Sequence, residues 1–158
     1  MSNSGVKQIL AHWKESVPND RLAHLIRDVS RAQMRALQDR LDAHGVSFGH
    51  WSFLRILWVQ DGLTQKTLSD LAGVMEPTTF SAMKAMEAQG LIERRHLPGN
   101  RKSIHVFLTN SGRQLEKKLV PLAEEVNAIS VAGLTSSQVQ TVRSALMKVL
   151  ANLANDGE

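Results

Sequence analysis

The sequence predicts a mainly α-helical fold with one small β-hairpin, and three observations support this class. Apolar residues recur every three or four positions along most of the chain, which is the spacing of one helix face. The stretch 91–108 instead alternates apolar and polar residues on either side of a Pro-Gly turn, as paired strands do. A length of 158 residues with 42% hydrophobic residues is enough for one compact module with helical extensions.

The N-terminal part predicts one long helix after an irregular start. Residues 1–17 contain only a short apolar patch, so we expect little structure there beyond a helical turn near Trp13. A Pro-Asn-Asp sequence follows, in which Asn19 is suited to cap a helix. Apolar positions then fall on roughly one face over residues 21–44, and Gly45 ends this helix.

The central part predicts three helices separated by short turns. The first covers residues 49–60 and is apolar nearly all the way round, which indicates a buried helix. Thr64 can cap the next helix, and a Gly-Val-Met sequence that starts at Gly73 forms the turn after it. The third helix opens with Glu76-Pro77, because proline is tolerated in a first helical turn, and it stops at Gly90. Its apolar face is expected to consist of Phe80, Met83 and Met86.

The C-terminal part predicts a hairpin followed by two helices. Strands over residues 91–95 and 103–108 flank a turn at residues 97–100. Thr109 can cap a long helix, a glycine breaks it, and Thr135 can cap a last helix. Both helices are too apolar along one stripe to stand alone, so they need each other, the first helix or a second copy of the chain. The stripes are Leu115, Leu119, Leu122, Val126 and Ile129 in the first, and Val139, Val142, Leu146, Val149 and Leu153 in the second.

Helix, turn, helix and basic hairpin in this order form a winged helix-turn-helix, which places its second helix in a DNA major groove. Small hydroxyl side chains on that helix allow close approach to base edges, and its N-terminus attracts phosphate. A basic hairpin beside it is suited to the minor groove or the flanking backbone. The residues expected to contact DNA are Thr78, Thr79, Ser81 and Lys84 on the helix and Arg94, Arg95, Arg101 and Lys102 on the hairpin.

Each of these residues also has a purely structural interpretation. Two threonines near a helix start can act as caps, and Arg94 and Arg95 can form a solvated strand edge. The order of the elements favours DNA binding over these alternatives. A net charge of +4 and a pI near 9.8 are compatible with a polyanionic partner.

The chain resembles the MarR family of bacterial transcriptional regulators. The motifs that carry the resemblance are Leu63-Thr64-Gln65, the junction Met86-Glu87-x-x-Gly90-Leu91-Ile92-x-Arg94, and Leu108-Thr109-x-x-Gly112. The order of helices before and after them also fits, so the resemblance extends over nearly the whole chain. One departure lies in the wing, where the family usually has Asp-x-Arg and this chain has Asn100-Arg101-Lys102. The usual carboxylate–guanidinium brace is therefore absent, and Arg101 becomes the better candidate for insertion into a groove.

The resemblance implies one MarR-type domain over about residues 18–155 with three functional parts. These are an N-terminal dimerisation segment (1–45), a winged helix-turn-helix region (46–109) and C-terminal dimerisation helices (110–158). A homodimer would place two such modules on double-stranded DNA at a pseudo-palindromic operator. The family also implies a repressor that a small-molecule effector releases from this operator.

An effector site is expected near the start of the helix 49–60. There Trp51 supplies a flat stacking wall and Arg55 a partner for a carboxylate, so an aromatic carboxylate would fit. His44 and His50 belong to this predicted cluster, and Trp13 and His24 could join if the first helix folds over it. The alternative is that Trp51 and Trp58 are simply core residues.

Several other classes of function lack support in the sequence. There are no cysteines, which excludes disulfides, thiolate zinc sites and cysteine redox sensing. The six histidines form no tight ligand motif, so we expect no metal and no cofactor. No Gly-rich phosphate loop or paired nucleophile and base is present, so we do not expect an enzyme. No apolar window is long enough to cross a membrane, so we expect a cytoplasmic protein without a membrane partner. A protein-interaction module that uses the winged fold without DNA remains an alternative.

Overall fold

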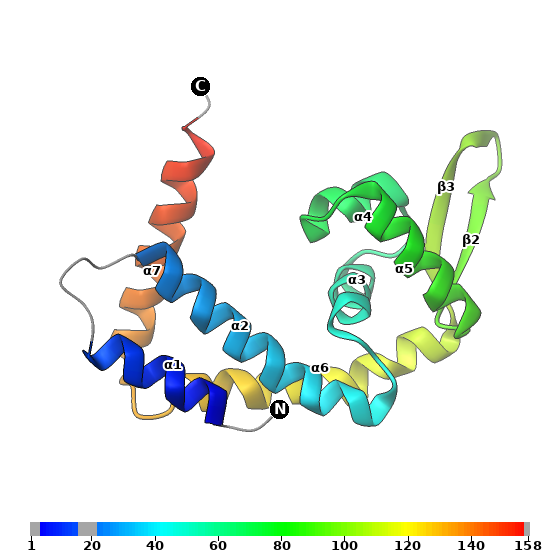
Figure 1. The fold of residues 1–158 in the computed structure, drawn as a ribbon. Coiled ribbons are helices and arrows are strands. Elements are labelled where there is room, and N and C mark those ends of the chain that lie inside the picture. The colour runs from blue at the N-terminus through cyan, green and yellow to red at the C-terminus, as the bar shows by residue number, and fades with distance from the viewer. Residues whose placement is uncertain (1–3, 16–21, 157–158) are drawn as a thin grey trace.

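The computed structural model describes residues 4–15 and 22–156, and it confirms the predicted fold class. A mainly helical chain carries one small antiparallel sheet (Figure 1). The helices are α1 (Ser4–Glu15), α2 (Leu22–Leu41), α3 (Phe48–Val59), α4 (Gln65–Ala72), α5 (Glu76–Ala88), α6 (Asn110–Ser130) and α7 (Ser136–Ala154). A 3-10 turn, Asp42–His44, follows α2, and the strands are β1 (Leu63–Thr64), β2 (Ile92–Leu97) and β3 (Asn100–Leu108).

Helix α1 corrects the expectation of an irregular N-terminus. Its apolar residues Val6, Ile9 and Trp13 are spaced as on one helix face, and they line a hollow against α2. Trp13 Nε1 donates a hydrogen bond to Asp28 Oδ2 at 3.1 Å, which lowers the pKa of this carboxyl group. The predicted cap Asn19 lies outside the described residues.

Most helix boundaries follow from local capping chemistry. The predicted caps Thr64, Thr109 and Thr135 each accept a hydrogen bond from a backbone N–H in the first turn of their helix. Ser47 caps α3 in the same way, and this cap was not predicted. Gly73 ends α4 in the left-handed conformation that favours glycine.

The sheet has the strand order β1-β3-β2, with both pairs antiparallel. Strands β2 and β3 form the predicted hairpin, whereas β1 was not predicted. It consists of two residues, too few for an alternating pattern, and it exists because Leu63 pairs with Val106. This pairing fixes the base of the hairpin to the start of α4.

A single core joins α2, α3, the sheet and α6. Leu54 and Leu57 of α3 are almost inaccessible to solvent, and Met83 and Met86 of α5 are fully buried. On α6, Leu119 and Val126 of the predicted stripe are buried within the chain, where α6 packs against α2. Among the described residues, no helix combines the length and the apolar character needed to span a membrane.

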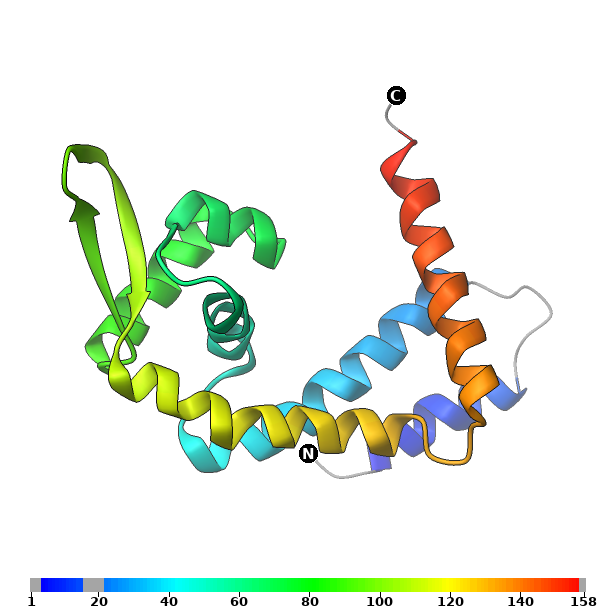
Figure 2. The same ribbon diagram turned by 180° about the vertical axis from the view of Figure 1, so that it is seen from behind.

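Helix α6 joins two differently built parts of the molecule (Figures 1 and 2). At its N-terminal end lie α3, α4, α5 and the sheet, which we call the reading module. At its other end, α7 projects away and has no buried residue among those described.

A close backbone approach at Gly112 holds the reading module against α6. The backbone N–H of Thr109 donates to Leu91 O at 3.0 Å. A Cβ at position 112 would overlap that same carbonyl oxygen. This contact gives a physical reason for the Leu-Thr-x-x-Gly motif at the start of α6.

Candidate DNA-reading surface and effector pocket

The outer face of α5 carries only some of the residues predicted to contact DNA. Thr78, Ser81 and Lys84 are exposed. Thr79 is fully buried, and its hydroxyl is hydrogen bonded to Ser69 Oγ at 2.7 Å. The prediction for Thr79 is therefore wrong in this structure, because the side chain joins α4 to α5 instead of facing outward.

Phe80 is the second correction on α5. We expected it on the apolar face with Met83 and Met86, yet 53% of the residue is exposed. The helical period explains the difference, because Thr79, Met83 and Met86 are spaced four and three residues apart and share one side of the helix. Phe80 follows one position later, which turns it about 100° away from that side.

Arg94 is engaged in a brace between β2 and α5. Its Nε and Nη2 atoms donate to Glu87 Oε2 at 3.0 and 2.7 Å, and its backbone N–H donates to Glu87 Oε1 at 3.2 Å. The guanidinium hydrogen bond lowers the pKa of the Glu87 carboxyl group. Arg94 is therefore not one of the freely available cations, which corrects its predicted role as a DNA contact.

The remaining predicted cations are available in different degrees. Within the part of the chain that the structure describes, Lys84, Arg101 and Lys102 are exposed and their side chains make no hydrogen bond or ion pair. Arg95 is exposed but stacks on Phe107, with the guanidinium carbon 4.0 Å from the ring centroid. The free cations thus lie on α5 and near the tip of the hairpin.

The tip of the hairpin is ordered without the usual carboxylate brace. Asn100 Oδ1 accepts hydrogen bonds from the backbone N–H groups of Lys102 and Ser103 at 3.1 and 3.3 Å. The amide therefore holds the turn, and Arg101 is left free, in line with the sequence expectation.

Lys66, exposed in the first turn of α4, is a further free cation among the described residues that was not predicted. Its position two residues after the cap Thr64 was the available signal.

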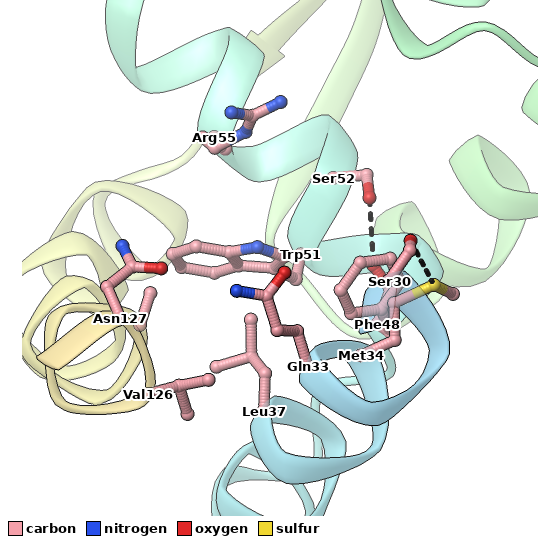
Figure 3. A pocket seen from close by; sticks show the side chains of 11 residues that line it. Ser30, Gln33, Met34, Leu37, Phe48, Trp51, Ser52, Arg55, Val126 and Asn127 are labelled. Carbon is pink, nitrogen blue, oxygen red and sulfur yellow. Dashed lines mark hydrogen bonds between the residues drawn. The ribbon is translucent and has the colours of Figure 1, made fainter. Parts of the chain in front are cut away.

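A cavity of about 390 Å³ lies between α2, α3 and α6 (Figure 3). The Trp51 indole forms one wall, and Arg55 follows one turn later on the same side of α3. Arg55 is exposed and makes no hydrogen bond or ion pair among the described residues. The polar side chains Gln33 of α2 and Asn127 of α6 complete the opposite walls, and neither was predicted.

Four other residues of the predicted effector cluster do not line this cavity. His44 is exposed in the 3-10 turn, and His24 lies on α2. Trp13 belongs to the hollow between α1 and α2. His50 precedes Trp51 on α3 and so points to a different side, where burial lowers its pKa and a hydrogen bond with Gln89 partly offsets this effect.

A chain of contacts connects the cavity to the base of the hairpin. Trp51 meets Trp58 edge to face, with 5.6 Å between ring centroids. Trp58 Nε1 donates to Gly112 O at 2.9 Å, at the junction of β3 and α6. Next to it, Asp61 Oδ1 accepts from the backbone N–H of Leu108 at 2.9 Å. These contacts extend from the cavity wall to β3, the strand that carries Arg101 and Lys102.

The sequence and fold agree with one family of regulators. Residues 46–104 match the model of the MarR family. The winged helix-turn-helix region is thus a MarR-family domain. A MarR-family relative by fold is the transcriptional regulator from Methanosarcina mazei, which is 25% identical with a TM-score of 0.77; the match covers 83% of this chain and 94% of that one. The family match indicates a DNA-binding transcriptional regulator.

Two further relatives extend this comparison to most of the chain. The organic hydroperoxide resistance transcriptional regulator of Bacillus subtilis is 25% identical over 134 residues, which cover 85% of this chain and 90% of the relative. A MarR-family structure from Listeria monocytogenes, solved in complex with a 26mer DNA, is 27% identical with a TM-score of 0.78. That match covers 87% of this chain and 91% of the other. The relatives named here are all transcriptional regulators, and none is an enzyme.

Proposed function

We propose that this chain is a homodimeric repressor that leaves its operator when a small aromatic anion binds between α2, α3 and α6. The observation that carries the proposal is the cavity in which Trp51 and an unpaired Arg55 lie together. Its volume of about 390 Å³ is in the range of small-molecule sites. An indole wall suits a flat ring, and a guanidinium pairs with a carboxylate through two hydrogen bonds.

Ten exposed apolar residues on α1, α2, α6 and α7 support a homodimer. They lie on the elements outside the reading module, and a second copy of the chain would bury them against the same elements of its own. They are Val6, Leu10, Leu22, Val29, Ile129, Val142, Leu146, Met147, Leu150 and Leu153. Two reading modules related by a twofold axis match a pseudo-palindromic operator whose half-sites lie about one helical turn apart. The dimer would act in the cytoplasm, where its operator DNA would lie.

The position of α3 suggests how an effector changes DNA affinity. One side of α3 forms the cavity wall, and its Leu54 and Leu57 lie in the core of the reading module. An effector that fits only one spacing of α3 from α2 and α6 would favour that spacing, because a ligand shifts the population toward the state that it binds better. The distance between the two modules of a dimer would change, and with it the fit to two major grooves.

The experiment is a fluorescence-anisotropy titration against the upstream intergenic DNA of the gene, with and without a panel of aromatic carboxylates. Arg55→Ala is expected to keep DNA binding and to lose relief by the effector. Arg31→Ala is the matched control, since it removes an exposed arginine of α2 outside the cavity. DNA binding that no compound relieves, or equal relief in the Arg55→Ala variant, would contradict the effector site.

A second arm tests the wing. Arg101→Ala is expected to weaken DNA binding broadly, because it removes a free cation near the hairpin tip. A dimer with roughly eight phosphate contacts should show a log–log salt slope of about −7. A slope near zero, or unchanged affinity for Arg101→Ala at moderate salt, would contradict the electrostatic part of the proposal.

A further inference from the structure

An exposed phenylalanine stands on the helix that is expected to enter the major groove. Phe80 is 53% exposed, whereas Met83 and Met86 of the same helix are fully buried in the core of the reading module. An exposed aromatic ring does not contribute much to folding. Its half-exposed ring is available for contact with a partner.

A contact with Arg94 fixes the position of the Phe80 ring. The Arg94 guanidinium carbon lies 5.8 Å from the ring centroid, in cation–π range. Arg94 is in turn fixed by its hydrogen bonds to Glu87, and its Nη1 is 3.5 Å from Gln65 Oε1. The ring is thus positioned before any partner binds, which reduces the entropy lost on contact.

The surroundings of Phe80 limit what it can contact. A hollow between the starts of α4 and α5 is lined by Gln65, Glu76, Pro77, Phe80 and Ser81. Phe80 has no hydrogen-bonding group, so it cannot bind a phosphate or the polar edge of a base. In the major groove the apolar group on a base edge is the C5-methyl of thymine, which apolar side chains contact in recognition helices.

We propose that Phe80 is a specificity-determining residue that selects thymine through contact between its ring and the C5-methyl group. The inference rests on the DNA-binding function and adds the base that this side chain selects. Cytosine at the same position lacks the methyl group and presents an amino donor that Phe80 cannot accept. Arg94 acts here as a positioning residue, since its charge is paired with Glu87.

The test begins with selection of duplexes from a randomised library by the purified full-length chain. Each thymine of the selected site is then replaced by deoxyuridine, which removes only the methyl group. Replacing the one thymine that Phe80 contacts in a half-site is expected to weaken binding of the wild-type chain about fourfold, the effect of one buried methyl group. The same change should have no effect on Phe80→Ala and a retained effect on Phe80→Leu.

The matched control is Val59→Ala, which removes an exposed apolar side chain at the end of α3 and should keep the full deoxyuridine effect. Circular dichroism checks that each variant is folded. If deoxyuridine leaves wild-type binding unchanged at every thymine, or weakens Phe80→Ala equally, the role of Phe80 is overturned while DNA binding stands. If no duplex is enriched at all, the DNA-binding function fails and the inference fails with it.

Discussion

The reading module and helix α7 have similar apolar content but very different burial. In the reading module, Leu54 is fully buried and Leu57 is 1% exposed. In α7, Leu150 and Leu153 are 63% and 65% exposed. The core of the module is thus formed within one chain, whereas the exposed apolar face of α7 (Val142, Leu146, Leu150 and Leu153) has no partner among the described residues. The same periodic spacing of apolar residues can therefore form a core within one chain or one half of an interface between two chains.

The largest expected effect contrasts one leucine from each region. Leu54→Ala should lower the free energy of unfolding by about 2–5 kcal/mol, because it removes buried atoms and leaves a cavity. Leu150→Ala should change the stability of a monomer little, since most of that side chain is exposed. Urea denaturation at several protein concentrations measures both. An equal loss that is independent of concentration would remove the distinction between the two regions.

A charge on this apolar face of α7 tests the interface directly. The double variant Leu146→Glu/Leu150→Glu should be monomeric by light scattering, because an interface does not bury unpaired charges. Loss of the second half-site should weaken operator binding roughly 100-fold. Ser144→Glu, on the exposed opposite side of α7, is the matched control. A double variant that stays dimeric would place the interface elsewhere.

The contact between the reading module and α6 can be weakened without disturbing the core of the module. Trp58→Phe keeps an aromatic ring beside Trp51 but removes the N–H that donates to Gly112 O. The expected loss of stability is about 1 kcal/mol, the usual net value of one hydrogen bond. Relief of DNA binding by an effector should also decrease, because the link from the cavity to the base of β3 is weaker. Unchanged relief would show that the signal takes another route.

The smallest expected effect concerns pH and the reading module alone. Burial lowers the pKa of His50 in the folded chain below its ordinary value of 6.5, so the unfolded chain binds a proton more readily. The contribution of His50 to stability is therefore present above pH 6.5 and is lost as the pH falls through the lowered value. Urea denaturation at about pH 7.5 and about pH 5.5 should show this loss in the wild type and a smaller one in His50→Gln. His44→Gln controls for removal of a histidine, and an equal pH dependence in His50→Gln would contradict the assignment.

Local chemistry in the sequence was sufficient to predict most of the secondary structure. Thr64, Thr109 and Thr135 cap the helices that they were expected to cap, since a cap depends on residues three positions away. The hairpin was also predicted, because its turn residues and alternating strands are close in sequence, although β2 extends to Leu97 and β3 begins at Asn100. The helix Ser4–Glu15 was missed because its stability depends on contact with α2.

Tertiary structure alone decided which side chains serve the core, the DNA-reading face and the cavity. Thr79 is buried and Phe80 is exposed because α5 docks on α4 with one particular rotation, which no local pattern specifies. Arg94 became a brace because Glu87, seven residues away, lies beside it once β2 returns along α5. The sequence thus predicted most of the helices and their caps, which depend on neighbours along the chain. The rotation and spacing of those elements, and with them the candidate sites, depend on packing between distant residues, which only the folded chain brings together.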